Sequence, residues 1–198
     1  MELRRYGSRA VLVDVASPTQ AAALAAWARG RVDAAEIVPA ARTVLFDAVA
    51  SPEALRSALD GWIPTEESPP GPLVEIPVVY DGADLAFVAE AWGVPVGEVA
   101  ARLGSLELVS AFCGFAPGFA YLAGLPREWH LPRLESPRSR VPAGSVALAG
   151  EWCGVYPSAS PGGWRIVGRT STTLWDATRE PPAVLAPGTR VRFTEEGR

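Results

Sequence analysis

The sequence predicts an α+β protein in two parts: a small N-terminal α+β domain with its linker, residues 1–72, followed by a β-rich domain, residues 73–198. Three observations predict this division. Strand-like apolar runs alternate with helix starts at the N-terminal end, a proline-rich acidic stretch follows at Pro64–Pro72, and short apolar runs separated by turn signals fill the remainder. The stretch at Pro64–Pro72 is therefore expected to be the linker between the domains.

The sequence of the N-terminal part predicts a strand, a helix, two strands and a second helix, in that order. Ser17-Pro18 and Ser51-Pro52 each supply an N-cap followed by a proline at the first helical position. The expected elements are a strand at 10–15, a helix from Ser17 to Gly30, strands at 35–38 and 43–46, and a helix from Ser51 to Gly61. Such a unit forms a small sheet with helices on one face.

The C-terminal part starts with a strand and two helical segments and then becomes all β. Asp84 is expected to cap the first of these helices. The expected elements are a strand at 73–80, a helix from Asp84 to Trp92, helical turns at 95–103, and strands at 106–112, 119–122, 145–149, 164–167 and 189–193. This pattern is typical of a closed or sandwiched β domain.

Composition supports a folded chain and excludes several mechanisms. With 198 residues and 48 % hydrophobic content, the chain can bury a substantial core. All eighteen basic residues are arginine, so a P-loop lysine, a Schiff-base lysine and a Ser-Lys dyad are excluded. The single histidine, His130, lies in a proline-bounded loop, and no GxSxG motif surrounds Ser145 or Ser160. The chain thus lacks a complete catalytic set of its own, and we leave its catalytic residues unassigned.

Metal binding, export and membrane insertion are not indicated either. One histidine and two distant cysteines, Cys113 and Cys153, do not provide the ligand spacing of a zinc site, and we expect both cysteines to be free thiols. No long uncharged apolar stretch and no export signal are visible. We expect a cytoplasmic protein with neither a nucleic-acid nor a membrane partner.

The segment Phe112–Thr170 concentrates positive charge in an acidic chain. The segment contains six arginines and three acidic residues, Glu128, Glu135 and Glu151, which gives it a local charge of +3. The rest of the chain, whose net charge is −4 in total, therefore carries −7. Arginines beside glycine-rich turns are suited to holding carboxylates or phosphates. The segment therefore predicts a small anionic ligand or an acidic partner surface.

Aromatic residues flank a predicted tight turn in this segment. Pro117-Gly118 fits the centre of a type II turn, which would bring the rings of Phe115 and Phe119 together. Tyr121 shares the strand face of Phe119 and adds a hydroxyl group. These rings either line a ligand site or form an aromatic mini-core beneath the turn.

Glycines form the second candidate feature. Gly162 and Gly163 precede Trp164, and together with Gly144 their backbone N–H groups could form an anion-binding nest, with Arg138 or Arg169 completing the charge. The alternative is that these glycines serve structural turns and that the arginines are solvated.

The motifs GFAPGFAYLAGL, SPRSRVPAGSVALAG, GVYP and SPGGWRIVGRT resemble the family that contains the B subunit of prokaryotic 5-oxoprolinase, the sporulation-kinase inhibitor KipI and allophanate hydrolase subunit 1. The likeness extends to YGSRAVLVDV, EIPVVYDGADL and LAPGTRVRF. The resemblance implies that the β domain is a cyclophilin-like β-barrel. It also implies two partners: a C-type subunit, which is KipA-like and similar to biotin-dependent carboxylases, and an A-type subunit. Together these subunits use ATP to convert 5-oxo-L-proline to L-glutamate, and no cofactor is expected on this chain alone.

The same resemblance leads to a hypothesis for the substrate site. Arg138 and Arg169 would bind anionic groups, and Phe119, Tyr121 and Trp164, with Phe115 beside them, would surround the substrate ring. The backbone would be shaped by Gly144, Ser145, Gly162 and Gly163. These assignments follow the chemical need to stabilise negative charge when a lactam is opened.

One departure and two alternatives qualify the resemblance. Leu103 occupies a position where we expect many relatives to carry histidine. The alternatives are an interaction module that inhibits a histidine kinase, as in KipI, and an accessory component of a urea or allophanate carboxyltransferase or hydrolase. A prolyl-isomerase activity is not supported, because fold likeness alone carries no activity.

Overall fold

The computed structural model describes residues 2–65 and 71–197. The chain divides into two compact units, Met1–Pro69 and Pro70–Arg198. Part of the expected linker, residues 66–70, lies outside the described residues. Each unit has its own core.

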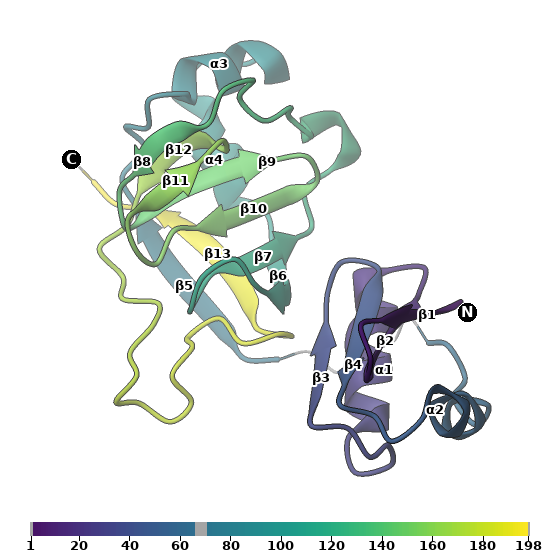
Figure 1. Ribbon diagram of the computed structural model, residues 1–198. Helices are drawn as coiled ribbons and strands as arrows, with labels where there is room; N and C mark the ends of the chain where they lie inside the picture. The colour runs from purple at the N-terminus through teal and green to yellow at the C-terminus, as the bar shows by residue number, and fades with distance from the viewer. Residues whose placement is uncertain (1, 66–70, 198) are drawn as a thin grey trace. The chain divides into compact units, whose positions relative to one another are not determined.

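The N-terminal unit contains an antiparallel four-stranded sheet in the order β1-β2-β4-β3 (Figure 1). Its elements are β1 (Leu3–Tyr6), β2 (Ala10–Asp14), α1 (Pro18–Ala28), β3 (Glu36–Pro39), β4 (Thr43–Asp47) and α2 (Pro52–Leu59). The sequence prediction missed β1, which pairs with β2 after a turn at Gly7 with φ +69°. This edge strand is short and mostly exposed, so it shows no apolar pattern.

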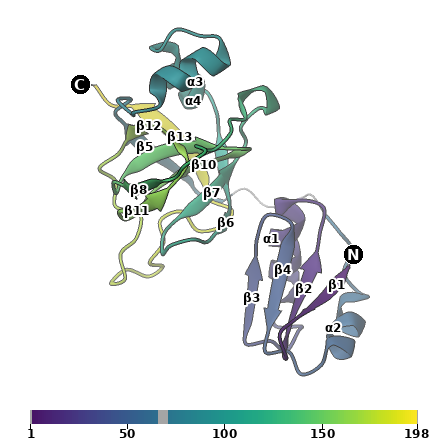
Figure 2. The same ribbon diagram turned by 45° about the horizontal axis from the view of Figure 1, so that its top comes forward.

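Both predicted helix starts of this unit are confirmed. The Ser17 hydroxyl accepts a hydrogen bond from the Gln20 backbone N–H at 3.1 Å, and Ser51 accepts one from Ala54 at 3.0 Å. Alternate residues of β2 and β4, including Val13 and Phe46, are buried against the helices. Figure 2 shows α1 lying along one face of this sheet, as the sequence predicts.

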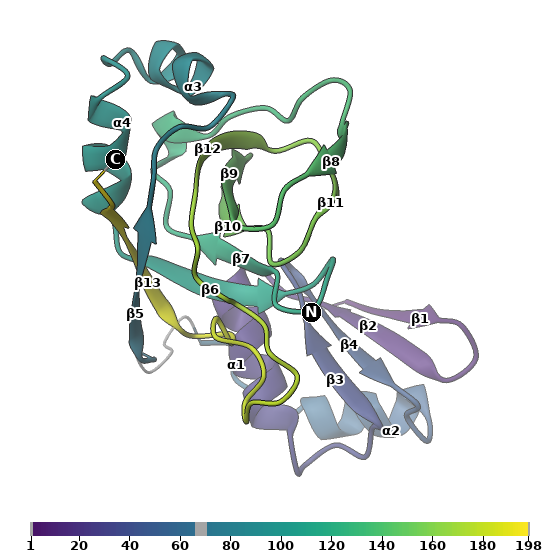
Figure 3. The same ribbon diagram turned by 90° about the vertical axis from the view of Figure 1, so that its left-hand side faces the viewer.

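The C-terminal unit is built on a seven-stranded sheet in the order β12-β9-β10-β7-β6-β13-β5, with a separate two-stranded sheet of β8 and β11. Val79 and Arg169 exchange backbone hydrogen bonds, which bring the end of β5 beside β12 and nearly close the sheet into a barrel (Figure 3). The elements are β5 (Leu73–Val78), α3 (Leu85–Trp92), α4 (Glu98–Gly104), β6 (Leu108–Cys113), β7 (Ala120–Ala123), the 3₁₀ helix η1 (Arg127–Trp129), β8 (Arg138–Val141), β9 (Ser145–Ala149), β10 (Trp152–Val155), β11 (Ser160–Gly162), β12 (Arg165–Arg169) and β13 (Arg190–Glu195). This arrangement confirms the predicted α+β class with a C-terminal barrel.

Three strands of this unit were not predicted: β8, β10 and β11. Arg138 and Arg140 both lie in β8, where β11 is the hydrogen-bonded partner. In the part of the chain that the structure describes, no helix is long and apolar enough to cross a membrane.

Two cores lie on opposite faces of the barrel sheet. The main core combines residues of the inner sheet face, such as Leu148 and Phe193, with Val88 of α3 and Leu103 of α4. Leu103 is fully buried there and offers no polar group. The second core lies between the outer face of β7, β10, β9 and β12 and the β8–β11 sheet. Figure 3 shows α3 and α4 on the side of the barrel away from β8 and β11.

Candidate functional site

The predicted turn at Pro117-Gly118 is present. The Phe119 backbone N–H donates to the Ala116 carbonyl at 3.0 Å, and Gly118 has φ +81°, the value that a type II turn requires at this position. Phe115, just before the turn, has φ +70°. A bulky side chain in this region costs about 1–3 kcal/mol. Phe115 is nevertheless 62 % exposed, so burial does little to offset the strain.

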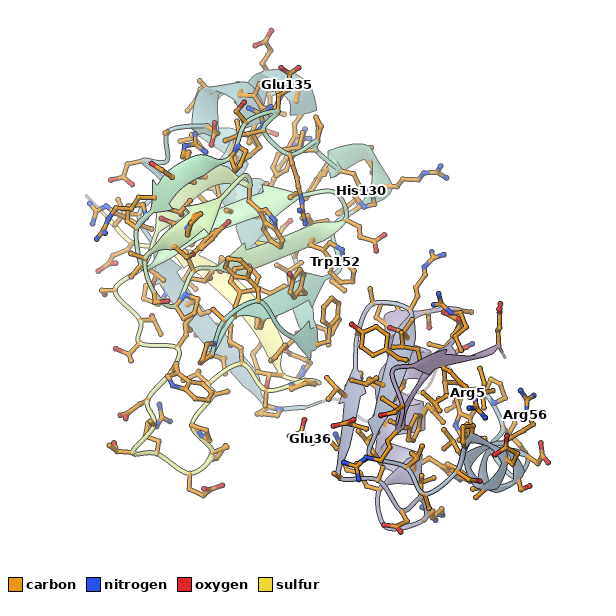
Figure 4. The ribbon with its side chains drawn as sticks, viewed as in Figure 1. Arg5, Glu36, Arg56, His130, Glu135 and Trp152 are labelled. Atoms are coloured by element: carbon orange, nitrogen blue, oxygen red, sulfur yellow. The ribbon has the colours of Figure 1, made fainter. Side chains whose placement is uncertain are left out.

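An aromatic cluster lies beneath the turn, composed of Phe112, Phe115, Phe119, Tyr121, Trp152, Tyr156 and Trp164. Its centre is Phe119, whose ring centroid lies 5.2–5.4 Å from the rings of four neighbours: Phe115, Tyr121, Tyr156 and Trp164. Trp152 (Figure 4) meets Phe112 at 5.2 Å and Tyr121 at 5.9 Å. Edge-to-face packing of this kind fills the space between the rings. Phe119 and Trp164 are buried core residues in this structure.

Gly162 is required by the approach of a tyrosine hydroxyl. A side chain at Gly162 would overlap the hydroxyl of Tyr156. Burial raises the pKa of Tyr156, and a hydrogen bond from the Trp164 backbone opposes this rise. The neighbouring Gly163 is under no such constraint, because a side-chain carbon there would meet Pro137 at an ordinary 3.6 Å.

Ser145 begins β9 and Gly144 directly precedes it, and the backbone groups of Gly144 form hydrogen bonds within the fold. Gly144 has φ +78°, and a side chain there would overlap the Thr170 carbonyl. Its N–H donates to the Tyr156 carbonyl at 2.7 Å, and its carbonyl accepts from Thr170 at 2.9 Å. The Gly144 N–H is therefore engaged within the protein.

The predicted site residues do not line one enclosed pocket. Trp164 and Arg169 lie near opposite ends of β12, and a strand that rises about 3.3 Å per residue separates them by roughly 16 Å. The ten residues fall into two groups. Seven lie around the aromatic cluster (Phe115, Phe119, Tyr121, Arg138, Gly162, Gly163, Trp164), where Arg138 pairs with Gly162 and contacts the Trp164 carbonyl, and three lie at the other end of β12 (Gly144, Ser145, Arg169).

Arg138 is held by the carboxylate of Asp84, the residue that was expected to cap α3. Its Nη2 donates to both Asp84 oxygens at 2.9 Å, and its Nη1 donates to the Trp164 carbonyl at 3.3 Å. Asp84 also accepts from the Ile166 backbone N–H at 2.7 Å and lies 3.8 Å from Arg165. Asp84 occupies the N-cap position of α3, as predicted, but its side chain forms no capping hydrogen bond. Asp84 instead ties the start of α3 to β8 and β12.

Arg169 is held much more loosely. Its Nε donates to Asp81 at 2.9 Å, and its side chain is 66 % exposed. Among the described residues, its two terminal nitrogens have no partner. Arg169 borders a surface hollow of about 490 Å³, whose lining consists of Val79, Asp81, Arg169, Ser171, Glu196 and Gly197. This guanidinium could therefore accept an anionic ligand from solvent.

One short loop, Tyr80–Asp84, supplies both aspartates. Its Gly82 lies directly on β12, donating its N–H to the Val167 carbonyl at 3.1 Å, and a side chain there would overlap the backbone of β12. The predicted surplus of positive charge in Phe112–Thr170 is thus partly neutralised by Asp81 and Asp84, which lie outside that segment. A charge count within one segment could not reveal this pairing.

The remaining reactive side chains are engaged or buried. His130 Nε2 lies 3.2 Å from the Leu125 carbonyl. Both cysteines are free thiols, as predicted, and burial raises the pKa of Cys153 to about 12. The Tyr80 hydroxyl is buried without a hydrogen-bond partner, and burial raises its pKa as well. Within residues 2–65 and 71–197, no three His, Cys, Asp or Glu side chains gather as a metal site would require.

Curated relatives of this chain share one name. The chain is 46 % identical over 143 residues to the 5-oxoprolinase B subunit of Escherichia coli O157:H7, which covers 70 % of this chain and 66 % of the relative. The proteins of the same name in Haemophilus influenzae and Bacillus subtilis are 41 % and 42 % identical, covering 63 % and 61 % of this chain. The matches span 60 % and 52 % of those two relatives, so all three extend beyond the matched segment.

Solved structures show the same architecture. A structure of the protein TTHA0988 matches with a TM-score of 0.80 and 36 % identity, covering 96 % of this chain and 40 % of that one. The protein PH0987 from Pyrococcus horikoshii matches with a TM-score of 0.59 and 33 % identity over nearly its whole length, 98 %. The Kluyveromyces lactis urea carboxylase matches with a TM-score of 0.75, covering 98 % of this chain and 22 % of that one, and its 19 % identity shows the fold alone.

The family model described as "Carboxyltransferase domain, subdomain C and D" matches residues 1–185. This match covers both units of the chain. The protein therefore belongs to the carboxyltransferase-domain family, subdomains C and D.

Proposed function

We propose that this chain is the B subunit of an ATP-dependent 5-oxoprolinase that converts 5-oxo-L-proline to L-glutamate in the cytoplasm. The observation that carries the proposal is the 41–46 % identity to three relatives that are each named as the B subunit of 5-oxoprolinase. The two other functions considered for this family, kinase inhibition and a urea or allophanate pathway, gain no comparable support. The likeness to urea carboxylase, at 19 % identity, concerns the fold only.

The arrangement of reactive groups supports a protein that does not act alone. His130 contacts a backbone carbonyl, and the buried thiol of Cys153 has a raised pKa, so neither is prepared to act as a base or nucleophile. A lactam is a stable amide, and opening it requires activation of its carbonyl. We therefore assign ATP use to the assembled complex, with a carboxylase-like C-type subunit and an A-type subunit as partners.

Arg169 is the predicted site residue best placed to bind the substrate carboxylate. Its terminal nitrogens face solvent beside a hollow, whereas the Arg138 guanidinium is occupied by Asp84. A planar guanidinium binds a carboxylate through two parallel hydrogen bonds. Of the other predicted site residues, Ser145 pairs with Arg169 across β9 and β12 and would support it, whereas Tyr121 and Gly163 belong to the group at the other end of β12.

The direct test is an omission assay. The chain and its C-type and A-type partners are purified and mixed with ATP and 5-oxo-L-proline, and released glutamate is measured with each component left out in turn. We expect glutamate only from the complete mixture. Undiminished release without this chain would refute the proposal.

Arg169→Ala tests the assigned role within the active mixture. We expect a KM for 5-oxo-L-proline at least about tenfold higher, since a charge-assisted hydrogen bond contributes about 1.5–3 kcal/mol. Arg127→Ala, at an exposed position on η1, is the matched control and should leave KM unchanged. An unchanged KM in Arg169→Ala would remove this residue from the site.

A further inference from the structure

We propose that Phe115 and Trp175 form the docking surface through which this chain binds its carboxylase-like C-type partner. The inference rests on the proposed function and adds the surface that the partner contacts. Phe115 precedes the turn Ala116–Phe119, and Trp175 lies on a long segment, residues 171–188, which we call the arm. Both side chains are large, aromatic and exposed, at 62 % and 38 %.

Phe115 lies at the centre of a γ-turn, in which the Ala116 N–H donates to the Gly114 carbonyl at 2.8 Å. Its ring lies edge-on to Phe119 at 5.4 Å and to Tyr156 at 6.3 Å, yet most of its surface faces solvent. Its positive φ would suit glycine better. Strained and exposed residues of this kind are concentrated at functional sites. The turn accounts for the backbone conformation but not for the side chain, since glycine would adopt this φ without strain, so the exposed ring points to a role outside the stability of this chain.

The arm extends away from the barrel strands, as Figures 1 and 2 show in yellow-green, but its base is firmly anchored. Val184 donates its N–H to the Leu174 carbonyl at 3.0 Å, and the Ser110 hydroxyl donates to the Leu185 carbonyl at 2.9 Å. Leu174 and Leu185 are both buried. Further out, Asp176 donates its N–H to the Pro182 carbonyl at 3.1 Å. The arm is thus an ordered projection.

Close contact joins the arm to the turn. A side-chain carbon on Gly118 would lie only 2.6 Å from Cβ of Trp175 and 3.4 Å from Cβ of Pro157. The positive φ of Gly118 also favours glycine there. Because the turn packs directly against the arm at Trp175, the positions of Phe115 and Trp175 are fixed relative to each other. Pre-organised aromatic anchors are typical of interface hot spots, since little side-chain entropy is lost on binding.

A protein partner fits this surface better than a small ligand. Small-molecule sites bury most of the ligand surface, whereas a side chain that is 62 % exposed projects outward. The segment Gly114–Phe119 carries no charge, so its complement is an apolar groove. In TTHA0988 the fold of this chain accounts for 40 % of one longer polypeptide, so the same fold occurs joined to a further protein segment. The C-type subunit is the corresponding separate partner here.

The test measures the affinity of purified chain variants for the purified C-type partner by titration calorimetry without substrate. Phe115→Gly accepts the native φ and removes the ring, and Trp175→Ser keeps the backbone bonds of the arm. We expect each variant to bind at least about tenfold more weakly than the unmodified chain. Val96→Ser, which removes an exposed apolar side chain ahead of α4, should bind with unchanged affinity. Thermal unfolding of Phe115→Gly should occur at no lower temperature than that of the unmodified chain, because glycine relieves the strain of the positive φ.

The outcomes separate this inference from the function on which it rests. If the unmodified chain binds the C-type partner and supports glutamate release while both variants bind equally well, the docking surface is wrong and the function stands. Variants that assemble normally but raise KM for 5-oxo-L-proline would show that the surface contacts substrate instead. An unmodified chain that does not bind the C-type partner would overturn both proposals.

Discussion

Arg138 and Arg169 look alike in the sequence, and the structure gives them opposite environments. Each meets an aspartate of the loop Tyr80–Asp84. Arg138 donates to a buried carboxylate and to a backbone carbonyl, whereas Arg169 makes one contact with a half-exposed Asp81. One guanidinium is committed to the fold, and the other remains open to solvent. Burial of the partner and the number of satisfied donors, rather than residue type, distinguish a structural arginine from a candidate binding arginine.

Replacing Asp84 should have the largest effect. Asp84→Ala would leave the Arg138 guanidinium and the Ile166 N–H without their acceptor, and we expect the free energy of unfolding to fall by about 3 kcal/mol or more. Asp84→Asn, which keeps an acceptor oxygen, should lower the free energy of unfolding by less than Asp84→Ala. Urea denaturation measures both values. A loss below about 1 kcal/mol in Asp84→Ala would show that the buried pair is no more important than a surface pair.

The contrast between buried and exposed groups also predicts how the stability of the protein changes at alkaline pH. The pKa of Cys153 is raised from 9.0 to about 12 in the folded protein, because burial disfavours the thiolate. This stabilising contribution is complete below pH 9, the ordinary value, and is lost as pH rises toward 12. Stability should therefore decrease across this range by up to about 1.4 kcal/mol per pH unit from this thiol.

Cys153→Ala isolates that contribution. Its unfolding free energy should decrease less steeply with pH than that of the unmodified chain, although Tyr80, Cys113 and Tyr156, whose pKa values are also raised by burial, retain part of the slope. Denaturant titrations at several pH values between neutral and alkaline provide the measurement. Parallel curves for the two proteins would contradict the account.

The smallest effect on stability is expected for the exposed ion pair between Asp81 and Arg169. Asp81→Ala and Arg169→Ala should each change the free energy of unfolding by less than about 1 kcal/mol, since solvent screens this ion pair. This change in the free energy of unfolding should be smaller still at high salt, because salt screens the attraction between the two charges. Chemical denaturation at low and high ionic strength tests this. A loss as large as that of Asp84→Ala would show that Arg169 is also a structural residue.

Locally encoded features could be predicted from the sequence. Both helices of the N-terminal unit begin at a serine followed by proline, and the type II turn at Pro117-Gly118 depends on one glycine and one proline. These signals lie within a few residues of the structure that they determine. The approximate positions of most barrel strands also followed from apolar runs bounded by turns.

Features set by distant partners could not be predicted in the same way. Strand β8 has a polar, arginine-rich sequence and is defined by pairing with β11, which itself contains only serine, proline and glycine. Asp84 follows the local rule for a helix cap, yet its partners Arg138 and Ile166 lie 54 and 82 residues away. Only the closure of the barrel brings these groups together.

Double-mutant cycles on the two ion pairs test the central contrast most directly. One cycle combines Asp84→Ala with Arg138→Ala, and the other combines Asp81→Ala with Arg169→Ala, with coupling energies taken from urea denaturation. We predict about 2 kcal/mol or more for the buried pair and less than about 1 kcal/mol for the exposed pair. Equal coupling energies would contradict the assignment of Arg138 to the fold and of Arg169 to a ligand.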